Sequence, residues 1–183
     1  KRRMLASIHA QAMRAHEMIA DLMLFARPPK LKLAAIDLWE LLERVVAELQ
    51  PMAAQQRTEI NLQKHDAQSL GIEADATQLA VALRALIQNS LEALGSEGVV
   101  TVTVAADAAA ATITVSDNGP GIPADVLPHI FEPFYSGRES GRGLGFGLSK
   151  CWRIVTDHGG EIQVTSAAPG ATRFEVRLPL SGS

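Results

Sequence analysis

Four short segments of this chain hold residue types that can do chemistry at close spacing. They are Asn89 within Leu83–Leu94, the turn Asp117–Ile122, the aromatic segment Phe131–Arg138 and the glycine-rich segment Gly141–Leu148. The carbonyl oxygen of an asparagine side chain is a hard ligand of the kind that Mg²⁺ prefers. Asn89 is therefore a candidate magnesium ligand.

The turn after residue 116 combines a carboxylate with small residues. Asp117 follows the alternating run Ala111–Val115, so its carboxylate is expected at a strand end where the backbone turns tightly. There it could accept a hydrogen bond from the amino group of an adenine. Gly119, Pro120 and Gly121 leave no side chain to obstruct a flat base, and glycine permits a close approach.

The glycine-rich segment precedes a helical stretch, Phe146–His158. Gly141, Gly143 and Gly145 would let backbone amides and a helix N-terminus point at phosphate oxygens. A metal ligand, a base slot and a phosphate cradle, occurring in this order, predict a nucleotide pocket.

Each segment alone also has an ordinary interpretation. Asn89 could be a solvated helix residue, and Asp117–Ile122 could be a surface turn, because turns select these residue types. The glycines match neither the dinucleotide fingerprint nor the lysine-bearing phosphate loop. Phe131, Phe134 and Tyr135 are more typical of a core than of ligand contacts. The occurrence of all four segments in order favours the pocket.

The set resembles the asparagine box, first glycine box, phenylalanine box and second glycine box of sensor histidine kinases, in the superfamily shared with gyrase, MutL and related chaperone ATPases. The resemblance covers about residues 31–183. It implies that ATP and Mg²⁺ bind here, with Asn89 on the metal and Asp117 on the adenine. The ATP-binding residues that it implies are Asn89, Asp117, Gly119, Gly121, Ile122, Arg138, Gly141, Arg142, Gly143, Leu144 and Gly145.

A short lid would lie between Phe134 and Gly141, with Arg138 and Arg142 as phosphate contacts or solvated loop residues. The chain departs from the family at two positions. Hydrolytic relatives carry a glutamate four residues before the metal ligand, where this chain has Ala85, so hydrolysis lacks its general base. Many members have a lysine three residues after that ligand. This chain has Glu92 there, either a helper of the metal or a solvated residue.

Composition excludes some classes of protein and site. A net charge of −3 gives no support for nucleic-acid binding. Cys151, the only cysteine, can form no intrachain disulfide and is expected to be a buried helix residue in a reducing compartment. The sequence has no signal peptide and no apolar run near the roughly 20 residues that span a bilayer. We expect a cytoplasmic segment without membrane contact, although its parent could be membrane-anchored.

The elements that must position these residues follow from periodicity. A helical seam near the N-terminus consists of Leu5, Ile8, Ala12, Ala15, Ile19, Leu22 and Ala26, and Pro28 and Pro29 end it. Asp37 with Glu40, and Asp75 with Gln78, predict the starts of two further helices, and Gly95 the end of the second. The inward positions expected for that second helix are Leu79, Leu83, Leu86, Ile87, Ser90 and Leu94. Strands are expected at Glu59–Gln63, Ser69–Glu73, Val99–Val104, Ala111–Val115, Glu161–Thr165 and Thr172–Leu178.

These elements predict an α/β fold, a two-layer sandwich of a mixed sheet covered by helices, preceded by one helix of a dimerisation hairpin. The expected domains are residues 1–30, part of that hairpin, and residues 31–183, the ATP-binding catalytic domain. The segment that includes residues 11–29 resembles the second hairpin helix. In the family the first hairpin helix carries the phosphorylated histidine. His9 lacks the residues that follow that histidine, and His16 matches them only through Glu17, which leaves His16 as a weaker candidate for the acceptor than a histidine of the first helix. Both histidines lie beside the helical seam and are expected on a partly exposed flank.

The leading hypothesis is a protein-histidine kinase, in which ATP phosphorylates a histidine supplied by that other helix for relay to a response regulator. The expected partners are ATP, a second copy of the parent kinase and a receiver domain, and this chain alone is not expected to phosphorylate itself. The alternatives are a non-catalytic ATP-binding regulatory or scaffold module and, disfavoured by Ala85, an ATP-hydrolysing machine of the same superfamily.

Overall fold

The computed structural model describes residues 30–65, 70–135, 145–167 and 170–180, together with residues 4, 8, 9, 11–13, 16, 19 and 23. The chain divides into two compact units, residues 1–30 and residues 31–183. In the first unit the described residues before Lys30 are helical and exposed, among them Ile8, Ala12 and Ile19 of the predicted seam and both His9 and His16.

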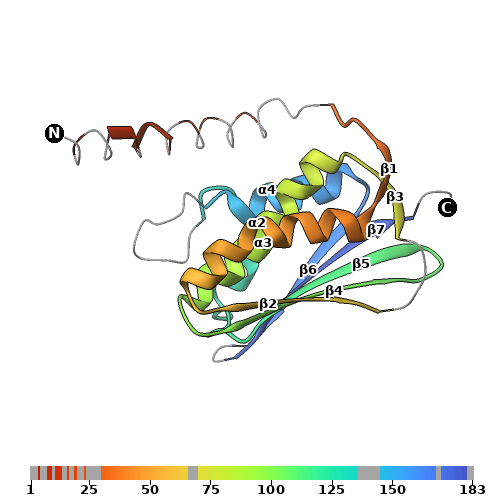
Figure 1. Ribbon diagram of the computed structural model, residues 1–183. Coiled ribbons are helices and arrows are strands. Elements are labelled where there is room, and N and C mark those ends of the chain that lie inside the picture. Colours follow the sequence, from red (N-terminus) through yellow and green to blue (C-terminus); the bar gives the residue numbers. More distant parts are fainter. Residues whose placement is uncertain are drawn as a thin grey trace. The chain divides into compact units, whose positions relative to one another are not determined.

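The second unit is a two-layer α/β sandwich, as the sequence predicted (Figure 1). Its main sheet has the strand order β2-β4-β5-β7-β6, in which β2 runs parallel to β4 and the other neighbours are antiparallel. The strands are β2 (Glu59–Lys64), β4 (Val99–Ala106), β5 (Ala110–Asp117), β6 (Glu161–Ser166) and β7 (Thr172–Pro179). The sheet is therefore mixed, and both predicted hairpins are present.

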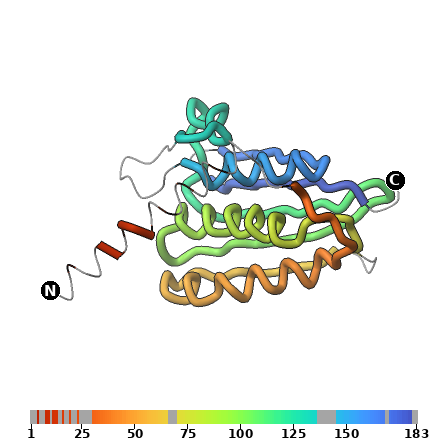
Figure 2. The backbone as a smooth tube through the Cα atoms, turned by 90° about the horizontal axis from the view of Figure 1, so that it is seen from above, coloured from red at the N-terminus to blue at the C-terminus, as the bar shows by residue number. Residues whose placement is uncertain are grey.

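Three helices cover one face of this sheet, and Figure 2 shows them side by side with α3 in the middle. They are α2 (Leu38–Gln55), α3 (Ala76–Leu94) and α4 (Gly147–Asp157). Asp37 and Asp75 cap α2 and α3 by accepting hydrogen bonds from backbone amides of the first turn, and Gly95 ends α3 with φ +70°. The predicted capping residues and helix end are thereby confirmed.

One predicted core position of α3 is wrong. The buried residues of α3 are Leu79, Ala82, Leu83, Leu86, Ile87, Ser90 and Leu91. Leu94, expected inside, is only half-buried, because α3 ends there and its side chain lies over Gly98 and Gly119. Cys151 is fully buried on α4 as predicted, and burial raises the pKa of its thiol.

Two elements were not expected from the sequence. The link after Lys30 forms strand β1 (Ala34–Asp37), which pairs antiparallel with β3 (Gly71–Ala74) in a separate two-stranded sheet. A short 3₁₀ helix, η1 (Leu127–His129), follows the Asp117 turn. Neither has an amphipathic period in the sequence, since both are too short to show one.

Candidate functional site

Asp117 lies at the end of β5 and points beneath α3. Its side chain continues the inward-facing series of Ile113 and Val115, and the residue is only 5% exposed. Its Oδ2 accepts a hydrogen bond of 2.8 Å from the hydroxyl of Ser90, and its Oδ1 accepts one of 3.0 Å from the backbone amide of Gly119. The carboxylate is thus held by a helix on one side and by its own turn on the other.

The turn after Asp117 is fixed to β4 and to the β6–β7 hairpin. Asn118 Oδ1 accepts from the Val99 amide at 2.8 Å, while the Ile122 amide donates to Ser166 Oγ at 2.8 Å. Gly121 has φ +77°, and a Cβ there would lie 2.5 Å from the carbonyl oxygen of Ala167. Only glycine suits that position, which gives the predicted glycine a definite backbone role.

Gly119 keeps the space beside the carboxylate open. A Cβ at Gly119 would lie 2.7 Å from Asp117 Oδ1 and 3.5 Å from Cδ2 of Leu94. Leu94 therefore forms an apolar wall next to the carboxylate. A flat, apolar ring with an edge donor, such as adenine, matches this combination of wall and acceptor.

Asn89 lies on α3, half-buried and adjacent to Ser90. Because Ser90 contacts Asp117, the structure brings the first two predicted segments together at one end of α3. Among the described residues no three His, Cys, Asp or Glu side chains gather to hold a metal ion. The side-chain carbonyl oxygen of Asn89 is a donor of the kind that Mg²⁺ accepts.

The aromatic and glycine-rich segments meet where α4 begins. Gly145 has φ +72°, and a Cβ there would lie 2.5 Å from the carbonyl oxygen of Tyr135. The Phe134 and Phe146 rings pack edge to face, with centroids 4.6 Å apart. Phe146 is the N-cap residue of α4, and its apolar side chain cannot accept hydrogen bonds from the amides of the first helical turn.

The interpretation of the aromatic residues as part of the hydrophobic core is wrong for Phe134. Phe134 has a φ of +67° and is 67% exposed, while Phe131 and Tyr135 are half-buried. Five predicted ATP-binding residues, Arg138, Gly141, Arg142, Gly143 and Leu144, lie outside the described residues.

Sequence reasoning missed Ser90, Leu94 and Ser166 as parts of the site. Ser90 had a usable signal, because it was the one hydroxyl among otherwise apolar inward positions of its helix, and a buried hydroxyl needs a partner.

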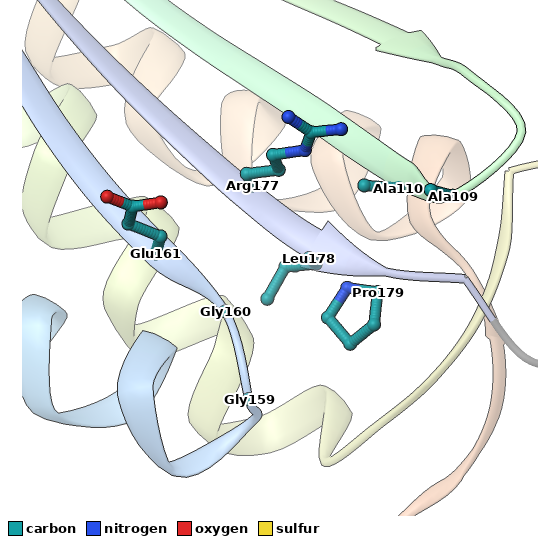
Figure 3. Close-up of a pocket in the computed structure, with 8 residues that line it drawn as sticks. All are labelled: Ala109, Ala110, Gly159, Gly160, Glu161, Arg177, Leu178 and Pro179. Atoms are coloured by element: carbon teal, nitrogen blue, oxygen red, sulfur yellow. The ribbon is translucent and has the colours of Figure 1, made fainter. Parts of the chain in front are cut away.

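A hollow lies elsewhere on the sheet, lined by Ala109, Ala110, Gly159–Glu161 and Arg177–Pro179 (Figure 3). The strand register pairs Ala110 with Pro179 but Asp117 with Thr172. This hollow is therefore at the opposite end of β5 from Asp117 and is separate from the candidate site.

The family of this chain follows from its similarity to known proteins. Residues 74–182 match the family described as "Histidine kinase-, DNA gyrase B-, and HSP90-like ATPase". The sensor histidine kinase ZraS of Escherichia coli (strain K12) is 33% identical over 171 residues, which cover 93% of this chain and 36% of the relative. The chain spans well under half the length of the curated relatives that it matches.

Solved structures show the same fold. The catalytic domain of the histidine kinase ThkA has a TM-score of 0.73 and 28% identity, with 81% of this chain and 95% of that chain covered. Full-length ShkA in complex with AMPPNP has a TM-score of 0.87 and 25% identity, with 98% of this chain and 38% of that chain covered.

None of the helices that the structure describes has both the length and the hydropathy of a membrane-spanning helix. The chain belongs to the histidine kinase-, DNA gyrase B- and HSP90-like ATPase family, in which it has the ATP-binding catalytic fold of the sensor histidine kinases.

Proposed function

We propose that this chain binds MgATP between α3, the Asp117 turn and the start of α4, and serves as the catalytic portion of a sensor histidine kinase. The observation that carries the proposal is the buried Asp117 carboxylate, held open to one side by Gly119 and bounded by Leu94. The ATP analogue in the related ShkA structure supports ATP as the nucleotide.

The chain's own residues have separable tasks in this proposal. Asp117 accepts the exocyclic amino group of adenine, and Gly119 and Gly121 keep the slot free of side chains. Asn89 offers its carbonyl oxygen to a magnesium ion, which when bound neutralises charge on the phosphates. The amides at the start of α4 face the phosphates, with Gly141, Gly143, Leu144 and Gly145 lining them and Arg138 and Arg142 as their cationic contacts.

Phosphoryl transfer requires a histidine presented in line with the γ-phosphate. The new bond joins phosphorus to an imidazole nitrogen, and the bond to the β–γ bridging oxygen breaks, so that ADP leaves with that electron pair. Ala85 places a methyl group where hydrolytic relatives place their base. Positioning and charge neutralisation are therefore the means of catalysis, rather than activation of water.

We further propose that residues 1–30 are one helix of a dimerisation hairpin and residues 31–183 the catalytic domain, in a cytoplasmic part of the parent. The exposed apolar side chains of the described helical residues, Met4, Ile8, Met13, Ile19 and Met23, support pairing with other helices of a homodimer. A response-regulator receiver domain would take the phosphoryl group from the histidine.

The test is phosphotransfer by the longer parent protein. With γ-labelled ATP and Mg²⁺, the parent should acquire acid-labile phosphate and pass it to a receiver domain. Nucleotide binding without any labelling would support the alternative of an ATP-binding regulatory module. Release of free phosphate without a labelled protein would support the hydrolytic alternative.

A further inference from the structure

Ser90 is a polar residue in an apolar layer. It is fully buried on the inward face of α3, between Ile87 and Leu91, and its hydroxyl donates to Asp117 Oδ2 at 2.8 Å, 27 residues away in the chain. Serine hydroxyls inside helices commonly donate to a carbonyl of the preceding turn of their own helix. The single hydroxyl proton of Ser90 is committed to the carboxylate instead.

This bond fixes how Asp117 presents its lone pairs. The Ser90 hydroxyl and the Gly119 amide each donate to a different oxygen of the carboxylate, so the plane of the group is defined at both ends. Each oxygen retains a second lone pair, and an ionised carboxylate has no proton to donate. The Asp117 carboxylate can therefore accept a hydrogen bond from a ligand in the slot but cannot donate one.

We propose that Ser90 is a positioning residue that makes the slot selective for 6-aminopurines over 6-oxopurines, an inference that rests on the proposed nucleotide site. The amino group of adenine donates to a carboxylate oriented in this way. The 6-oxo group of hypoxanthine is itself a hydrogen-bond acceptor. When it faces the Asp117 carboxylate, no hydrogen bond forms between the two, and the buried carboxylate lacks a donor from the ligand.

The decisive experiment combines a change in the protein with a change in the ligand. ADP, IDP and purine riboside diphosphate, which lacks any group at position 6, are titrated by calorimetry into the wild-type chain and into Ser90→Ala. We expect Ser90→Ala to weaken ADP binding by about tenfold, to leave purine riboside diphosphate within about twofold, and to narrow the ADP-to-IDP preference by about tenfold.

Two further variants separate positioning from packing. Ser90→Cys keeps a similar volume with a weak S–H donor, so its preference for ADP over IDP should lie between those of the wild type and Ser90→Ala. Thr156→Ala is the control, because it removes an exposed helix hydroxyl that donates to the carbonyl of Trp152, on α4 and away from Asp117. Its nucleotide preferences should equal those of the wild type.

The outcomes distinguish this inference from the proposed function. Equal weakening of all three ligands in Ser90→Ala would mean that Ser90 only supports the fold, and an unchanged ADP-to-IDP ratio would likewise overturn the positioning role while leaving the nucleotide site intact. Failure of the wild-type chain to bind any of the three would instead refute the site itself and the inference with it.

Discussion

Asp117 is the residue on which recognition of the base depends. In Asp117→Asn the amide carbonyl can still accept from Ser90 or Gly119, but its NH₂ group then faces the amino group of adenine. Losing a hydrogen bond to a charged group costs about 1.5–3 kcal/mol, so we expect ADP affinity to fall by about tenfold to a hundredfold. Calorimetric titration measures this fall. Unchanged affinity in a folded variant would remove Asp117 from the site.

Asn89 should affect a different part of the binding free energy. Because its side chain is assigned to the metal and not to the base, Asn89→Ala should abolish the Mg²⁺-dependent gain in ATP affinity while metal-free ADP binding changes little. Paired titrations with Mg²⁺ and with a chelator separate these two contributions. If both affinities fall equally, Asn89 supports the fold of α3 and the magnesium assignment is wrong.

At the scale of elements, the N-terminal end of α3 forms hydrogen bonds with two segments that are distant in the sequence. The Asp75 carboxylate caps the helix and accepts from the backbone amide of Lys32, and the Asp75 amide donates to Nε2 of His158 at 3.0 Å. Since Nε2 must accept, the His158 proton is on Nδ1, which donates to the Ile154 carbonyl at 2.8 Å. The beginning of α3 is thereby fixed to the end of α4 and to the link after Lys30.

This arrangement predicts a pH-dependent contribution to stability. Burial acts to raise the pKa of Asp75, but the amides of Lys32, Gln78 and Thr77 donate to its carboxylate and together hold the pKa below its usual 3.8. A carboxyl whose folded pKa is depressed stabilises the fold above its unfolded pKa and loses this contribution as pH falls through the folded value.

Asp75→Ala should therefore lower the free energy of unfolding by about 0.5–2 kcal/mol at pH 7, the usual worth of a helix cap. The difference from the wild type should shrink as pH falls below 3.8. Urea unfolding at a series of pH values measures both. A difference that stays constant through the acid range would show that the ionised carboxylate adds nothing to the cap.

The whole chain should bind ATP without labelling itself. The described histidines of its first unit, His9 and His16, lack the residues that follow the family's phosphorylated histidine, so γ-labelled ATP should leave no acid-labile phosphate on the chain. Label that disappears in His16→Gln would instead identify His16 as the acceptor and contradict the assignment of this helix as the second of the hairpin. Transfer to an added peptide that supplies the other helix would be the positive result.

The sequence was sufficient for features that depend on neighbours a few residues apart. The caps at Asp37 and Asp75, the end of α3 at Gly95 and both antiparallel hairpins follow from side-chain hydrogen bonds, helical periodicity and strand alternation, all of which are local. The order of the four segments was equally visible, because each is a contiguous run of residue types selected for backbone or ligand chemistry.

Tertiary structure alone decided which distant groups meet. The parallel pairing of β2 with β4, the pairing of β1 with β3, the Ser90–Asp117 bond and the His158–Asp75 bond join residues far apart in the chain. No local period encodes such partners, since a buried serine or histidine shows only that it needs a hydrogen bond and not where that bond will come from. The packing of α3 between α2, α4 and the sheet selects the partner, and so converts a serine expected only to face the core into a support for the candidate base-binding carboxylate.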